Sequence, residues 1–188
     1  QGVELDLSFR PTARFNVYLK GAYTDAEYVR FDDAPCPPEL SGGTTALPGQ
    51  TPSAPGTPGG ISPENCDISG QRLPGVSKWA FSYGAEYNHP AKLLGTSGEV
   101  YFGYDGSYRS GFSSNATPSI YTNVDGYSLS NFRVGFRSDD GLNLFAWARN
   151  ALDQEYFEQL QVPSGNTGLI VGNPGDAATY GVTAAFRF

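Results

Sequence analysis

The sequence has few charged residues, no methionine, one histidine and no long apolar run. Charged residues fill 16% of its 188 positions, against roughly 25% in an average soluble domain. The absence of any run of about 18 apolar residues excludes a helical membrane protein. The 24 glycines and 14 prolines argue against a helix-rich fold, because both residues destabilise helix interiors. Since residue 1 is Gln and methionine is absent, we expect a processed chain or an excerpt of a longer one.

Basic residues are also scarce, and this limits the partners. The chain has 12 Lys and Arg against 19 Asp and Glu, for a net charge of -7. Its basic residues form no patch that could follow phosphates, which excludes nucleic acid. Phosphate-binding loops, zinc-protease motifs and serine-hydrolase motifs are missing, and His89 lies in a predicted turn with Asn88 and Pro90. The sequence therefore predicts no enzyme, no cofactor and no metal site.

The two cysteines, Cys36 and Cys66, flank a proline-rich segment. Eight of the 14 prolines lie between Pro35 and Pro63. Such a stretch cannot bury a core. A metal site would need more ligands, and a catalytic cysteine would need a histidine base nearby. We therefore predict a Cys36–Cys66 disulfide that closes an exposed loop, which implies an oxidising compartment.

The sequence does contain clear alternation of apolar and polar residues with a period of two, which is typical of β-strands. In its last segment, for example, Tyr180, Val182 and Ala184 alternate with small or polar residues. Strands are predicted at residues 3–9, 15–19, 79–87, 100–104, 132–136, 142–149 and 180–188. The segment 142–149 is apolar on both faces, so its orientation is ambiguous. The fold class is all-β.

The lengths of the connections separate two all-β folds that share this alternation. A soluble sandwich turns its apolar face inward to a core, whereas a transmembrane barrel turns that face outward to lipid. Residues 10–13 and 138–141 are tight turns, and 88–97 is a joint of moderate length. The other connections, at about 26–77, 110–126 and 158–178, are long. Barrels alternate short periplasmic turns with long extracellular loops, so the pattern favours a barrel.

The stretch from Asn143 to Tyr156 resembles the penultimate strand of TonB-dependent outer-membrane receptors. This family usually has an Asn, apolar positions, an Asp and a Tyr here. Asn150, Leu152, Asp153 and Tyr156 match this motif. Ala151 departs from it, because a larger apolar residue is commoner at that position.

Two further segments are similar to the same family. Residues 72–79 look like a Leu-Pro-x-x-Pro-Lys-Trp strand entry, with Ser77 in place of the second proline. The chain ends like the last strand of the family, whose terminal aromatic residue is part of the signal read by the assembly machinery. The resemblance assigns that role to Phe188.

The resemblance implies an antiparallel transmembrane β-barrel of about 22 strands, of which this chain supplies about seven at the C-terminal end. We expect residues 1–188 to be the C-terminal part of the barrel domain. A long extracellular loop would lie at about residues 26–77, and the plug domain would not be in this chain. Seven is odd, and a bacterial single-chain barrel has an even number of strands, so the chain is expected to be a piece.

The function that the resemblance implies is active transport across the outer membrane. This segment would form barrel wall and extracellular loops for TonB-dependent uptake of a scarce nutrient, such as a ferric siderophore, cobalamin or an oligosaccharide. The implied partners are outer-membrane lipid, the plug and remaining barrel of the same receptor, the TonB complex through the plug, and the nutrient. The location would be a Gram-negative outer membrane, with long loops extracellular and the C-terminus periplasmic.

Candidate site residues lie on the polar face and in the long loops. The lumen-facing candidates are Tyr101, Asp105, Arg109, Asn131, Arg133, Arg137 and Arg187. The arginines among them could attract an anionic ligand or form a salt-bridge network with Asp and Glu. The loop candidates for stacking on a ligand are Phe31, Phe112 and Tyr121, with ordinary loop packing as the alternative.

Two other classes of protein fit the same alternation. One is a small non-transporting outer-membrane barrel with a structural or adhesive role. The other is a secreted β-sandwich that binds carbohydrate through its aromatic residues. A requirement for detergent would separate the sandwich from both barrels.

Overall fold

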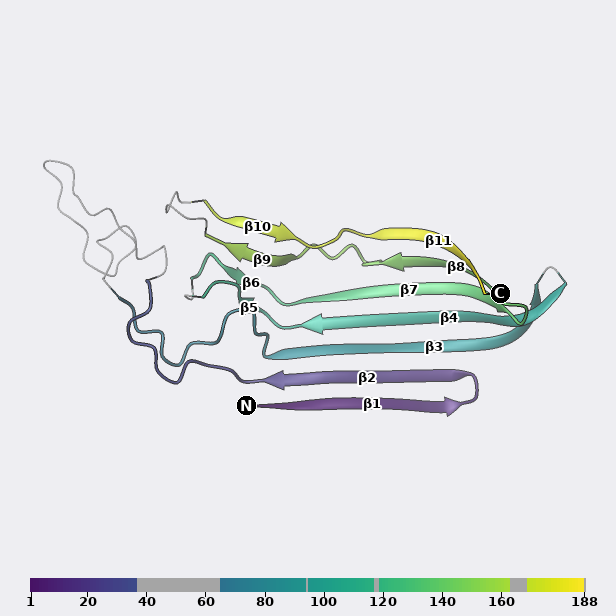
Figure 1. The fold of residues 1–188 in the computed structure, drawn as a ribbon, viewed down its shortest axis with the longest axis horizontal. Helices are drawn as coiled ribbons and strands as arrows, with labels where there is room; N and C mark the ends of the chain where they lie inside the picture. The colour runs from purple at the N-terminus through teal and green to yellow at the C-terminus, as the bar shows by residue number, and fades with distance from the viewer. Residues whose placement is uncertain (37–64, 94, 117–118, 163–168, 188) are drawn as a thin grey trace, which may run out of the picture.

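The computed structural model describes residues 1–36, 65–93, 95–116, 119–162 and 169–187. Its main feature is one antiparallel sheet of seven strands (Figure 1), whose spatial order is the order along the chain. The strands are β1 (Gly2–Thr12), β2 (Phe15–Thr24), β3 (Trp79–Leu93), β4 (Thr96–Arg109), β7 (Tyr127–Ser138), β8 (Leu142–Arg149) and β11 (Thr179–Phe186). The seven strands predicted from alternation are therefore confirmed. In the described part of the chain the sheet does not close, and β1 and β11 are its edges.

The connections are sorted by length between the two ends of the sheet. Short turns lie at one end, together with the C-terminus, and the long connections lie at the other (Figure 1). The prediction of a moderate joint at 88–97 was wrong. Pairing continues from His89 opposite Val100 to Leu93 opposite Thr96, so only residues 94–95 separate β3 from β4. Pro90 pairs with Glu99 inside the ladder and is not a turn residue.

Two small hairpins in the long connections were not predicted. β5 (Phe112–Ser113) pairs with β6 (Asn123–Val124), and β9 (Phe157–Gln161) pairs with β10 (Val171–Pro174). β5, β6 and β10 have only two to four residues, and β9, with the sequence Phe-Glu-Gln-Leu-Gln, does not alternate strictly, so the period of two did not reveal them. Among the described residues, no helix is long and apolar enough to cross a membrane.

The two faces of the sheet differ in chemistry. Residues paired across antiparallel strands point to the same face, so the register assigns each side chain to a face. The apolar face includes Phe102 and Val134, which are 49% and 54% exposed. The register also settles the orientation of β8, because Ala146 pairs with Val134 while Trp147 pairs with Arg133. Phe145 and Trp147 therefore belong to the polar face.

Candidate functional site

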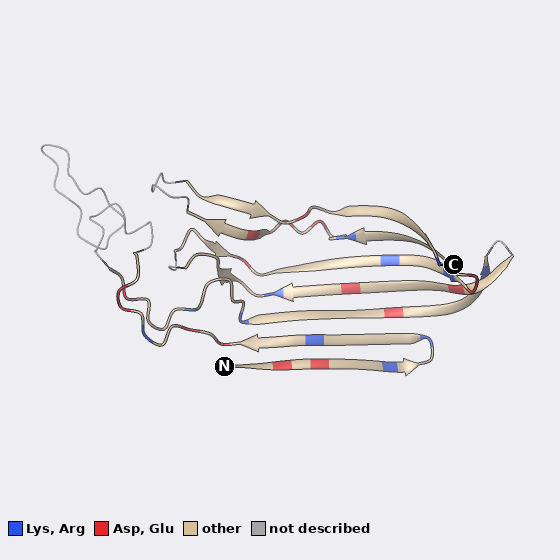
Figure 2. Ribbon diagram, viewed as in Figure 1, with Lys and Arg blue, Asp and Glu red and all other residues tan. Residues whose placement is uncertain are grey.

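An ion-pair network occupies the centre of the polar face and is built around Arg133. Its guanidinium lies 3.0 Å from a Glu86 carboxylate oxygen and also forms an ion pair with Asp105. Arg137 lies 4.0 Å from Glu86, and the Tyr18 hydroxyl donates to Asp105 at 2.9 Å. Figure 2 shows acidic positions on β3 and β4 beside a basic position on β7. The network therefore joins four neighbouring strands, and the Arg133 charge already has two anionic partners.

Glycine at position 103 makes this network possible. In the register, Gly103 lies between Glu86 on β3 and Arg133 on β7. A Cβ atom at position 103 would lie 2.6 Å from Nε of Arg133. Because glycine lacks that atom, the guanidinium can cross β4 and reach the Glu86 carboxylate.

Other predicted polar-face residues also take part in contacts within the sheet. Tyr101 is buried, its hydroxyl donates to Asn143 at 3.1 Å, and the Arg137 guanidinium lies 4.7 Å from the centre of its ring. The Asn131 side-chain oxygen accepts from the Asn150 N–H at 3.0 Å. Arg187 follows β11, and its N–H donates to a backbone carbonyl in the β7–β8 turn.

Arg109 lies at the long-loop end of β4 and contacts two connections. Its Nε donates to the Ser77 hydroxyl at 3.0 Å, and a second guanidinium nitrogen donates to the Gly75 carbonyl at 3.1 Å. The guanidinium also lies 3.9 Å from the centre of the Phe112 ring, and that ring is buried. Arg109 and Phe112 thus hold loops together.

The other two loop aromatics lie in different surroundings. Phe31 packs against Tyr28, with ring centres 5.4 Å apart, and its N–H donates to Ser69 at 2.9 Å. Tyr121 is 51% exposed. The three loop candidates therefore differ sharply in how much ring surface they leave open.

The motif that carried the family resemblance forms a compact set of hydrogen bonds after β8. Asn150 is 4% exposed and has a left-handed backbone, with φ of 44°. Its side-chain nitrogen donates to the carbonyls of Gln154 and Asp176, and its side-chain oxygen accepts from the Gln154 N–H, all at 2.9 Å. The Asp153 carboxylate accepts from the Ala178 N–H at 2.9 Å. The motif thus ties the end of β8 to the start of β11.

The two remaining motif residues are very different in burial. Leu152 is 74% exposed. The Tyr156 ring lies 4.2 Å from the ring of Tyr127, centre to centre, and a Cβ atom on Gly175 would overlap it at 1.9 Å. Burial, reinforced by Tyr127 and nearby carboxylates, raises the pKa of the Tyr156 hydroxyl. Tyr156 is therefore held in place between β7 and the residues that precede β11.

A cavity of about 770 Å³ lies at the long-loop end, between β6 and the β9–β10 hairpin. Its walls come from residues 123–127, 153–157 and 174–175 together with Leu160 and Ala177. The lining contains three carboxylate residues and no Lys, Arg or His. Sequence analysis missed this cavity, because its walls come from three separated stretches that share no motif.

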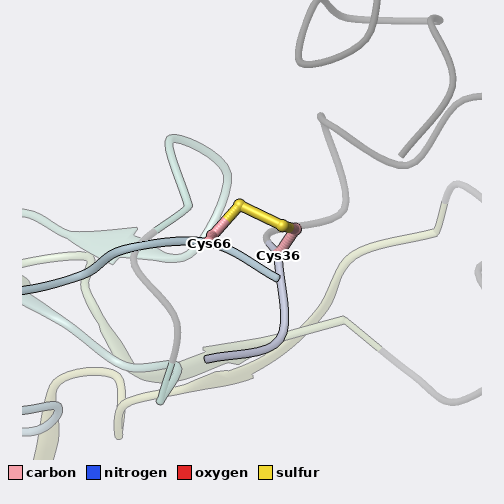
Figure 3. Close-up of a disulfide and its surroundings, with 2 residues drawn as sticks. All are labelled: Cys36 and Cys66. Carbon is pink, nitrogen blue, oxygen red and sulfur yellow. A yellow bond between two sulfur atoms is a disulfide. The ribbon is translucent and has the colours of Figure 1, made fainter. Parts of the chain in front are cut away.

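A disulfide joins Cys36 to Cys66 within the first long connection (Figure 3). Cys36 and Cys66 are bonded, with Cα atoms 5.0 Å apart. Two backbone hydrogen bonds between Ala34 and Cys66 continue the pairing on the strand side of the bridge. Hydrogen bonds from Ser69 lower the pKa of the neighbouring Asp67. The disulfide thus closes a stretch of paired chain that begins at the β-bridge between Glu27 and Arg72.

Two further predictions concern the C-terminal residue and metal binding. Phe188, the predicted assembly signal, falls outside the described residues. In the described part of the chain, no group of three or more His, Cys, Asp or Glu side chains could hold a metal ion.

The sequence matches a family model across most of its length. The model, TonB dependent receptor-like, beta-barrel, matches residues 1–151. The chain therefore belongs to this family, which implies the outer membrane of a Gram-negative cell. A comparison with curated protein sequences gives no match.

Two solved structures share the fold. One is the ferric yersiniabactin uptake receptor FyuA from Yersinia pestis, which aligns with 100% of this chain at a TM-score of 0.66 and 11% identity. The other is the siderophore receptor PiuA from Acinetobacter baumannii, which aligns with 97% at 0.57 and 16% identity. This chain spans 23% and 21% of those two chains. At such low identity the likeness shows the fold alone.

Proposed function

We propose that this chain is a wall segment of an outer-membrane receptor that imports a scarce nutrient with energy from TonB. Family membership supports the receptor class. Both structural neighbours are siderophore receptors by their titles, so a ferric siderophore is the first nutrient to test. Cobalamin and oligosaccharides are the other nutrients that the family resemblance implies.

The observation that carries the proposal is the exposed apolar face of a sheet whose other face is charged. Val134 is 54% exposed, yet its neighbour Arg133 on the opposite face has two ion-pair partners. In the described residues, the sheets besides the main one are only two-stranded hairpins, so no second sheet covers the apolar face as a sandwich requires. Lipid is the covering that suits this face.

The same geometry supports an orientation and a set of partners. In barrels of this kind the short turns are periplasmic and the long loops extracellular. We therefore place the long connections outside the cell and the C-terminus in the periplasm. The polar face, with Asp105, Arg133 and Arg137, would line the lumen. There it would meet the plug, which couples to TonB, while the rest of the barrel pairs with the sheet edges.

Arginine substitutions on the two faces test this proposal. Val134→Arg and Phe102→Arg should each lower the free energy of unfolding by about 2–4 kcal/mol, because a charge near the bilayer midplane is costly. Ser82→Arg is the matched control, since Ser82 is exposed on the polar face opposite Lys20. The measurement is urea unfolding of the chain inserted in lipid bilayers.

Two results would contradict the proposal. One is an equal loss of stability from Val134→Arg and Ser82→Arg. The other is a chain that stays monomeric and folded in buffer without detergent. Gly103 and Gly135 are unsuitable controls, because a Cβ atom at either position would lie within 2.6 Å of another side chain.

A further inference from the structure

The three long connections are hydrogen-bonded to one another at the end of the sheet. The first connection meets the second where the Gly75 N–H donates to the Ser113 carbonyl at 2.7 Å, beside the contacts of Arg109 with Gly75 and Ser77. The second connection meets the third at Ser114 and Leu160. Two small sets of contacts thus link segments that lie far apart in the sequence.

Ser114 makes the contact between the β5–β6 and β9–β10 hairpins. Its Oγ accepts from the Leu160 N–H at 2.9 Å and also lies within hydrogen-bond distance of the Leu160 carbonyl. On its own hairpin, Ser114 N–H donates to the Thr122 carbonyl at 3.0 Å, and Oγ lies 2.9 Å from the same oxygen. One half-buried hydroxyl therefore holds both backbone groups of Leu160 against the β5–β6 hairpin.

This contact lies beside the cavity described above. Leu160 lines that cavity, and so do Asn123 and Val124 of β6. Ser114 follows β5, which pairs with β6. The spacing between β6 and the β9–β10 hairpin, and hence the width of the cavity, depends on the distance between Ser114 and Leu160.

We propose that Ser114 is a positioning residue, which ties the β5–β6 and β9–β10 hairpins into one loop layer and holds the cavity between them at its observed width. The use of this cavity as a ligand contact rests on the proposed function, but the tie itself does not. When a ligand binds in a cavity whose walls are already held in place, the protein loses less conformational entropy. The Tyr127–Tyr156 contact joins two further residues that line the cavity.

The test is hydrogen–deuterium exchange of the chain in detergent micelles. In the unaltered chain the Leu160 amide should be protected, since its N–H is bonded to Ser114 Oγ. Ser114→Ala should raise its exchange at least tenfold and should also speed exchange of the amides of residues 171–173. Ser114→Thr keeps a hydroxyl and should restore protection. Ser113→Ala is the matched control, because the Ser113 hydroxyl bonds locally, to the Asn115 carbonyl at 3.3 Å.

A second readout reports on the cavity itself. Tyr156 lines the cavity and its pKa is raised by burial. In Ser114→Ala the wider cavity should admit water, and the pKa should move back toward its ordinary value. Tyrosine ¹³C NMR against pH measures this, with Tyr156→Phe to assign the signal. The same pKa should be unchanged in Ser113→Ala and in Ser114→Thr.

Three outcomes would overturn the inference. They are rapid exchange of the Leu160 amide in the unaltered chain, unchanged β9–β10 exchange in Ser114→Ala, and an equal effect of Ser113→Ala. The first outcome is measured on the unaltered chain, so it tests the inference even if Ser114→Ala does not fold. The exchange and pKa results could agree with the inference while Val134→Arg and Ser82→Arg lower stability equally. That combination would overturn the proposed function alone, so the two failures are distinguishable.

Discussion

Single residues on the polar face differ in how completely their charges are paired. Arg133 contacts two carboxylates from two strands, and its side chain is only 36% exposed. Lys20 contacts one carboxylate, Asp6, and both side chains are more than half exposed. Exposed pairs contribute little because water screens them. The two arrangements should therefore respond very differently to loss of the cation.

We expect Arg133→Met to lower the free energy of unfolding by about 1–3 kcal/mol, because Asp105 would lose its cationic partner and Glu86 would keep only Arg137, at 4.0 Å. Lys20→Met is the control and should cost at most about 1 kcal/mol. Urea unfolding in bilayers measures both. Similar losses in the two variants would show that the network does not stabilise the wall.

At the scale of elements, the ends of the strands are held by side chains and not by the strands themselves. The β8–β11 ladder ends at the pair Arg149–Thr179. Beyond that pair, Asn150 and Asp153 hold the two segments together through the bonds described above. Both have positive φ, which few residues other than glycine tolerate and to which Asn and Asp are suited. This accounts physically for an Asn and an Asp at these motif positions.

Asn150→Ala should destabilise the chain by about 2–3 kcal/mol, since it removes the three hydrogen bonds of a buried side chain. Asn150→Gly relieves the backbone but restores no hydrogen bond, so its effect should be smaller. Leu152→Ala, in the same motif but 74% exposed, should change stability by no more than about 0.5 kcal/mol. Thermal unfolding in detergent ranks the three variants, and a Leu152→Ala effect as large as that of Asn150→Ala would refute this account.

At the scale of the whole molecule, the described residues form one curved sheet with two faces and two open edges. Neither face has a second layer in the described part of the chain, and the strand order leaves one side of β1 and one side of β11 unpaired. Unpaired edges are a ready template for another strand. The sheet therefore offers two edges at which further strands could pair.

Hydrogen exchange across the sheet should follow this arrangement. In the chain in detergent, amides of the edge strands β1 and β11 should exchange faster than those of the central strands β4 and β7, which are paired on both sides. The difference should disappear when the chain is part of a closed barrel. Uniform exchange across all seven strands of the chain by itself would mean that the edges pair with something else, such as a second copy.

The sequence by itself determined the strands, the two faces and the family. Alternation is a property of neighbouring residues, so Val134 and Arg133 could be assigned to opposite faces without a structure. The cysteine pair and the motif at Asn150 were also visible, because residue type and spacing alone carry them. The length of the β3–β4 hairpin was missed, because Asn88, His89 and Pro90 are typical of turns and only pairing with β4 holds them extended.

Only the tertiary structure decided which side chains meet. That Arg133 crosses Gly103 to reach Glu86 depends on the register of three strands, and no local pattern encodes that register. The contact of Ser114 with Leu160 joins residues 46 positions apart, and Tyr127 at the start of β7 meets Tyr156 in the connection after β8. These contacts result from the alignment of whole strands, so they appear only once the chain has folded.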